Sequence, residues 1–84
     1  MTGFDLLDPK TLMILEAIDE AGRSLNFSEI IKRVDLPRQS VIGHVNWRML
    51  HKWLRVEKEE TDRNQRPIRY FGITPEGYAR MEAM

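Results

Sequence analysis

The sequence contains no cysteine, and it has no surplus of either charge. Without cysteine, the chain can form neither a disulfide scaffold nor a cysteine-ligated zinc site. With 84 residues, of which 42% are hydrophobic, it can close one modest core, which predicts a single domain over residues 1–84. So small a core depends on good packing or on self-association, and we therefore expect a homodimer.

Long hydrophobic runs are also missing. Nowhere do about 18 consecutive apolar residues occur, and the first residues, Met1 to Asp5, carry no basic leader. The sequence therefore predicts a cytoplasmic protein with no membrane partner.

The residue sets that serve catalysis or metal binding are absent from the sequence. There is no glycine-rich phosphate loop, and Ser24, Ser28 and Ser40 stand in helix-cap, helix-start and helix-face contexts rather than at a nucleophile elbow. His44 and His51 are two helical turns apart, and no third ligand is spaced to complete a zinc site. We expect no enzymatic activity, no metal and no cofactor.

The net charge of zero argues at first against a nucleic-acid partner, but the charges are segregated along the chain. Residues 38–70 hold 8 Lys and Arg against 4 Asp and Glu, whereas residues 1–37 hold 4 against 7. A neutral chain that concentrates its positive charge in one stretch can present a basic face. The alternative is chance segregation on a solvated surface.

Helix-start and helix-stop signals predict two helices in the first part of the chain. Asp8 and Pro9 form an N-cap followed by proline at the first helical position, and Gly22 ends this helix. Asn26, with a glutamate three residues later, matches a capping box and begins a second, short helix to about Val34.

A third helix follows a tight turn. Because Pro37 pushes the residue before it out of helical geometry, this helix begins near Pro37 or Arg38, and we expect it to last to about Trp53. Two helices separated by such a turn form a helix-turn-helix unit.

Two extended runs come next, Leu54 to Thr61 and Ile68 to Ile73, on either side of the polar stretch 62–67. This pattern predicts a hairpin with a basic tip. Thr74 and Pro75 then begin a last helix, from Pro75 towards Met84. The predicted fold is α+β and mostly helical: three helices, a two-stranded wing and a C-terminal helix.

This order of elements, together with one motif, resembles the winged helix-turn-helix transcription regulators of the MarR and PadR type. Members commonly have an Asp-Arg pair in the wing and a strand ending in Leu-Thr-x-x-Gly. Here the wing has Asp62-Arg63, and the strand ends in Ile73-Thr74-Pro75-Glu76-Gly77. The resemblance implies DNA binding through a recognition helix at about 38–53 and a wing at about 54–73. The chain differs in having Lys52 where a glycine usually precedes the wing.

A helical wheel divides the third helix into two sides. Its predicted core side carries Val41, Ile42, Val45, Met49 and Trp53. The opposite side and its shoulders carry groups that can hydrogen-bond to base edges or pair with phosphate, although an ordinary exposed helix face is the alternative. The residues expected to contact DNA from this helix are Arg38, Gln39, Ser40, Gly43, His44, Trp47 and Arg48.

Trp47 and Gly43 are the least ordinary residues of that outer side. An exposed indole needs a cover, so we expect Trp47 to pack on DNA sugars, on a partner chain or under the wing. Gly43 costs about 1 kcal/mol relative to alanine inside a helix, which indicates either a close contact or a tolerated glycine.

The wing tip is polar and basic, and such side chains can reach phosphates or the minor groove; a solvated loop is the alternative. Acidic residues precede it, but strand alternation lets some of them pair with Arg55, Lys58 or Arg69. The residues expected to contact DNA from the wing are Arg63, Asn64, Gln65, Arg66 and Arg69.

The leading hypothesis is sequence-specific binding of double-stranded DNA by a homodimer at a palindromic operator, in transcription regulation. Candidate residues for the dimer surface are Phe4 to Leu7, Tyr78, Met81 and Met84. We do not expect a sizeable pocket for a small-molecule effector inside one subunit, and the sequence names no effector.

The second hypothesis is a winged-helix protein-interaction adaptor within a larger complex. In that case Trp47, Leu50 and Leu54 would form the docking patch.

Overall fold

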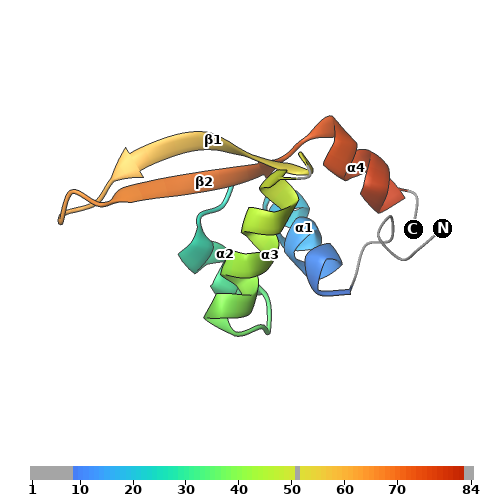
Figure 1. Cartoon of the computed structure of the whole chain (residues 1–84), viewed down its shortest axis with the longest axis horizontal. Helices are drawn as coiled ribbons and strands as arrows, with labels where there is room; N and C mark the ends of the chain where they lie inside the picture. Colours follow the sequence, from blue (N-terminus) through green and yellow to red (C-terminus); the bar gives the residue numbers. More distant parts are fainter. Residues whose placement is uncertain (1–8, 51, 83–84) are drawn as a thin grey trace.

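The computed structural model describes residues 9–50 and 52–82, and its elements follow the predicted order. Figure 1 shows a hairpin that extends beyond the helices on one side, with the last helix at its other end. This arrangement confirms the predicted winged helix-turn-helix fold. The elements are α1 (Pro9–Ala21), α2 (Phe27–Arg33), α3 (Arg38–Leu50), β1 (Leu54–Thr61), β2 (Pro67–Ile73) and α4 (Pro75–Glu82).

The signals at the end of α1 and the start of α2 act as predicted. Gly22 has a φ of 69°, a left-handed conformation that glycine adopts without steric penalty, and it follows the last residue of α1. Asn26 Oδ1 accepts a hydrogen bond from the Glu29 amide at 2.8 Å, and the Glu29 carboxylate accepts one from the Asn26 amide at 3.0 Å. The capping box is therefore confirmed.

Helix α3 begins where predicted but ends earlier. The carbonyl of Pro37 accepts the Val41 amide at 3.1 Å, so the helix starts at Arg38. Its last residue is Leu50, whereas the sequence predicted about Trp53. The reason is Lys52, whose φ of 63° takes the chain out of helical geometry and towards β1. Lys52 thus adopts the backbone conformation that glycine accommodates most easily.

The core lies where α1, α2 and α3 meet the base of the hairpin. Val41 and Val45 are completely buried, as the helical wheel predicted, whereas Ile42 is half-buried. Trp53 is buried from the turn before β1 rather than from α3, and the side chain of Met49 lies outside the described part. The buried apolar residues are Ile14, Leu15, Ala17, Ile18, Leu25, Ile30, Val34, Val41, Val45, Trp53, Leu54, Phe71 and Ile73.

The two strands are antiparallel, with Leu54 opposite Ile73 at the base and Thr61 opposite Pro67 near the tip. Glu57 is the extra residue of a bulge in β1. The segment between α1 and α2 also joins β2: Leu25 and Phe71 exchange two backbone hydrogen bonds of 3.0 and 2.8 Å. This bridge attaches the helix-turn-helix unit directly to the wing.

Thr74 joins the start of α4 to the turn that follows α3. Its hydroxyl donates a hydrogen bond to the carbonyl of Lys52 and accepts one from the amide of Gly77 at 3.1 Å. Its own amide donates to the carbonyl of Trp53 at 3.0 Å. The predicted N-cap of the last helix is therefore present, and the same side chain fixes where α4 leaves the wing.

Candidate nucleic-acid interface

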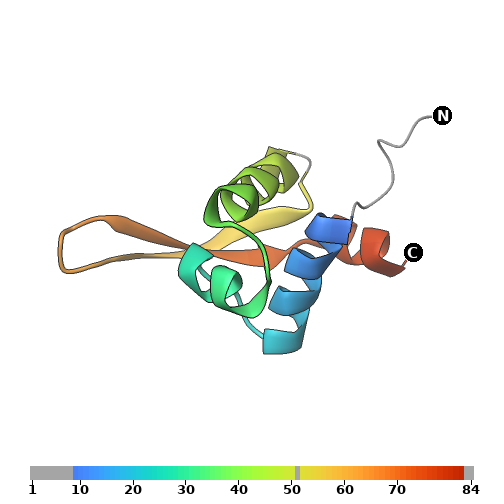
Figure 2. The same cartoon turned by 90° about the horizontal axis from the view of Figure 1, so that it is seen from below.

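The outer side of α3 is uncovered. Figure 2 shows α3 at one edge of the body, beside the hairpin, with no other described element over its outer side. Arg38, Gln39, Gly43 and Trp47 are exposed there, and Ser40 is half-buried. The indole of Trp47 is 52% exposed. These residues were all expected on this surface; the side chain of Arg48, expected beside them, lies outside the described part.

His44 lies closer to the core than the helical wheel predicted. It is half-buried, and its Nδ1 is 3.1 Å from the hydroxyl of Thr11, a residue of α1 that is 1% exposed. Three residues of helix correspond to a rotation of about 300°, so His44 is only about 60° from Val41 around α3. The buried arc of α3 therefore extends further on this side than expected, and His44 joins α3 to α1.

Gly43 has open space beside it. A methyl group at this position would meet no atom within 4 Å, leaving aside the backbone of its own helix. The packing around Gly43 in the described structure therefore does not require glycine. If Gly43 makes a close contact, that contact must be with a molecule that binds to the outer side of α3.

The wing tip has a fixed backbone conformation. Asp62 Oδ1 accepts hydrogen bonds from the amides of Asn64 and Arg66, at 2.8 and 2.9 Å. The backbone carbonyl of Asp62 also accepts the amide of Gln65, whose φ is 60°. The aspartate of the Asp62-Arg63 motif therefore organises the turn, and the four residues after it all have exposed side chains.

The acidic residues of β1 are paired with basic neighbours, as the alternation of the strands predicted. The ion pairs are Arg55 with Glu57 at 3.3 Å, Lys58 with Glu60 at 3.4 Å and Arg69 with Glu59 at 3.2 Å. The side chains of these pairs are 35–61% exposed, so each pair contributes little stability, about 0–1 kcal/mol. Their consequence is electrostatic: these carboxylates are partly neutralised within the wing.

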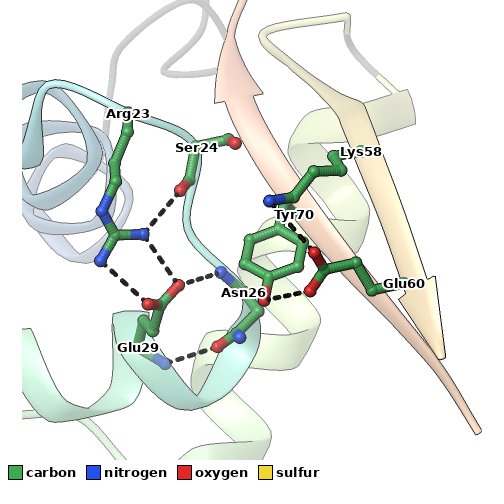
Figure 3. A network of polar contacts seen from close by, with 7 residues as sticks. All are labelled: Arg23, Ser24, Asn26, Glu29, Lys58, Glu60 and Tyr70. Atoms are coloured by element: carbon green, nitrogen blue, oxygen red, sulfur yellow. Dashed lines mark hydrogen bonds and ion pairs between the residues drawn. The ribbon is translucent and has the colours of Figure 1, made fainter. Parts of the chain in front are cut away.

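Figure 3 shows two neighbouring clusters of polar contacts, one on the wing and one at the start of α2. The Tyr70 hydroxyl donates to Glu60 at 2.9 Å, and the Lys58 ammonium lies 4.4 Å from the centre of the Tyr70 ring. The hydrogen bond from Tyr70, followed by that from Lys58, lowers the pKa of Glu60 below its usual value. In Figure 3 the ring of Tyr70 lies between the Lys58–Glu60 ion pair and Asn26 of the capping box.

In the cluster at the start of α2, Arg23 forms an ion pair with Glu29 at 2.9 Å. The hydrogen bond from Arg23, followed by that from the Asn26 amide, lowers the pKa of Glu29. Glu29 therefore both caps α2 and holds the arginine of the preceding turn.

Arg38, Arg63 and Arg66 form no ion pair with any carboxylate in the described ranges 9–50 and 52–82. Two of them line a hollow of about 440 Å³ between the hairpin and the starts of α2 and α3. We call this hollow the wing groove; the residues that define it here are Ser28, Arg38, Asp62, Arg66 and Arg69. It brings the start of the expected recognition helix and the tip of the wing onto one surface, which the sequence did not predict.

The structure shows that some residues of the candidate protein-docking patches are buried. Leu54, expected in the adaptor's patch with Trp47, is only 2% exposed, so that patch as predicted is wrong. Among the expected dimer residues, Tyr78 is 43% exposed, whereas Met81 packs against the core. The remaining candidates lie outside the described residues: Phe4 to Leu7, Met84 and the side chain of Leu50.

Two features are absent from the described residues. No group of three or more His, Cys, Asp or Glu side chains is placed to hold a metal ion there. Over the same residues, no helix is long and apolar enough to cross a membrane.

Comparisons with known proteins identify a fold but not a family. No family model matches the sequence, and no curated protein matches it. The structure is similar to that of BpsR from Bordetella bronchiseptica, with a TM-score of 0.77 and 21% sequence identity. The DNA binding of BpsR is regulated by 6-hydroxynicotinic acid. The match covers 96% of this chain and 58% of the BpsR chain. The chain therefore shares the fold of the matched part of BpsR and spans little more than half the length of the BpsR chain.

Proposed function

We propose that this chain binds double-stranded DNA in a sequence-specific manner and thereby regulates transcription. The observation that carries the proposal is the wing groove, which is lined both by Arg38 of α3 and by Arg66 of the wing. Neither arginine forms an ion pair with a carboxylate of the described residues. A basic surface continuous across both elements suits a duplex whose backbone passes between them. The likeness to BpsR, whose DNA binding is regulated, supports it.

In this proposal the two elements have different tasks. Side chains on the outer side of α3 would read base edges, while the wing would contact the phosphate backbone or the minor groove. His44, half-buried against Thr11, would take part only through the exposed portion of its ring. The proposed contacts from α3 are Arg38, Gln39, Ser40, Gly43, His44, Trp47 and Arg48, and those from the wing are Arg63, Asn64, Gln65, Arg66 and Arg69.

We also propose that the protein binds as a homodimer in the cytoplasm, at a palindromic operator. One small module buries roughly 600–1,000 Å² of protein surface on DNA, and a symmetric dimer doubles that area. The exposed ring of Tyr78 on α4 supports a self-contact away from the wing groove. The proposed function needs neither a cofactor nor a metal.

The exposure of Trp47 favours one alternative, a protein-interaction adaptor. A half-exposed indole on a helix face is typical of a residue that anchors a protein interface. In that case the outer side of α3 would bind a protein rather than a base sequence.

The experiment is a selection of bound fragments from genomic DNA, followed by fluorescence anisotropy titrations at two salt concentrations. A scrambled duplex of equal length and composition is the control. We expect tighter binding to the selected duplex and weaker binding to both at the higher salt concentration. Failure to bind any duplex at low salt would contradict the proposal and favour the adaptor.

A further inference from the structure

The three arginines of the wing groove are not equivalent. Arg38 and Arg66 have no ion pair with the described carboxylates, whereas Arg69 Nε is 3.2 Å from Glu59 Oε2. Glu59 and Arg69 are also direct cross-strand partners. Both side chains of the pair are more than half exposed, at 54% and 56%, so solvent and other ions reach it.

The Glu59–Arg69 pair lies on the same face of the hairpin as Phe71, a residue that packs on α2. Side chains alternate between the two faces along β2, so Arg69 shares a face with Phe71. The ring centroid of Phe71 lies 4.8 Å from that of Phe27 in α2. The neighbouring acid, Glu60, accepts its hydrogen bond from Tyr70, which is on the opposite face. Glu59 and Glu60, which are adjacent in β1, therefore form their contacts on opposite faces of the wing.

We propose that Glu59 is a negative regulator of DNA binding: a backbone phosphate that enters the wing groove must replace Glu59 as the partner of Arg69. The inference rests on the proposed function. Arginine binds phosphate through two parallel N–H···O bonds, as it does carboxylate. The exposed ion pair is weak, so the exchange is close to balanced, and the positive potential from Arg38 and Arg66 favours the phosphate.

This exchange has a consequence for selectivity. Every duplex offers phosphates, so the competition from Glu59 weakens binding to all sequences alike. A complex then depends more on the base contacts made by α3 to reach a given affinity. Glu59 thereby limits occupation of random DNA by a protein whose basic groove would otherwise bind it.

The test compares Glu59→Gln with Glu60→Gln. Each variant removes one negative charge from the same strand, but the first releases Arg69, which lines the wing groove, whereas the second releases Lys58, which does not line it. Anisotropy with a random duplex should show Glu59→Gln binding roughly two- to fivefold more tightly than Glu60→Gln. In an Arg69→Ala background the two variants should bind alike, because the residue that Glu59 restrains is gone.

Circular dichroism checks that each variant is folded, and Glu59→Ala provides a second variant if Glu59→Gln is not. Equal affinities of the Glu59 and Glu60 variants, in a protein whose wild type binds DNA, would overturn the inference and leave the proposed function intact. The same holds if the advantage of Glu59→Gln persists without Arg69. A wild type that binds no duplex would overturn both.

Discussion

Gly77 of α4 packs directly against the backbone carbonyl of Trp53. A methyl group at position 77 would overlap that oxygen and lie 2.8 Å from Cγ2 of Ile73. The Thr-x-x-Gly motif therefore has a physical role at the exit of the wing: Thr74 caps α4, and Gly77 lets the helix approach the turn that leads from α3 to β1.

Gly77→Ala should lower the stability of the protein. Relieving the overlap requires movement of backbone, and overpacking of this kind costs about 1–3 kcal/mol. In a domain of this size the melting temperature falls by roughly 4–8 °C per kcal/mol. Thermal unfolding followed by circular dichroism measures the change, and an unchanged melting temperature would show that the contact is not tight.

Gly43→Ala is the matched control and should have the opposite effect. Position 43 is exposed within α3 and has open space, so alanine should raise the stability by up to about 1 kcal/mol. If the variant is more stable but binds the selected duplex more weakly, Gly43 lies in close contact with DNA. If its affinity is unchanged, the close-contact hypothesis for Gly43 is wrong.

Asp62→Ala should loosen the wing tip, because Asp62 Oδ1 accepts the amides of Asn64 and Arg66. Those amides should exchange with solvent faster, and DNA affinity should fall because the tip arginines must be ordered on binding. Asp62→Asn keeps the acceptor oxygen and should remain close to wild type. If both variants instead bind DNA more tightly, Asp62 acts mainly as a charge that repels phosphate.

Arg63→Ala combined with Arg66→Ala should weaken binding to selected and random duplexes alike. Each lost phosphate contact should flatten the plot of log affinity against log salt concentration by about 0.9. Lys10→Ala combined with Lys32→Ala removes the same charge from exposed positions of α1 and α2 and should have a smaller effect. Equal effects of the two double variants would mean that only net charge matters.

The Arg23–Glu29 pair predicts acid sensitivity. Because hydrogen bonds from Arg23 and from the Asn26 amide lower the pKa of folded Glu29, its contribution is present above the unfolded pKa of about 4.3. That contribution is lost as the pH falls through the folded value. Glu29→Gln should therefore be less stable than wild type at pH 7, and the difference should shrink towards pH 3.

Urea unfolding across this pH range measures the effect, with Glu16→Gln as the control. Glu16 is exposed on α1 and belongs to no ion pair within the described residues. A constant difference between Glu29→Gln and wild type at all pH values would argue against a charge-dependent role of Glu29.

Elements with strong local signals were predictable from the sequence. The capping box at Asn26, the N-cap at Thr74 and the polar tip of the hairpin depend on neighbouring residues, so their spacing is visible in the chain. The buried positions of Val41 and Val45 follow from helical periodicity. The end of α3 was missed because a lysine at position 52 carries no helix-stop signal, although it adopts a left-handed φ.

Features that depend on distant residues were not predictable. The bridge of Leu25 to Phe71 involves a single residue pair and leaves no alternating pattern. The contact of His44 with Thr11 depends on how α1 packs across α3. The wing groove likewise appears only when the hairpin folds beside the starts of α2 and α3. The basic charge of residues 38–70 was its one visible signal.

The most direct test of the central claim, that α3 and the wing bind duplex DNA, is chemical-shift mapping by NMR. A duplex obtained by selection is added to ¹⁵N-labelled protein, and amide shifts are followed residue by residue. We expect the largest changes in residues 38–47 and 62–69, with small changes in α4. Changes centred on α4, or no changes at a duplex concentration that saturates binding, would contradict it.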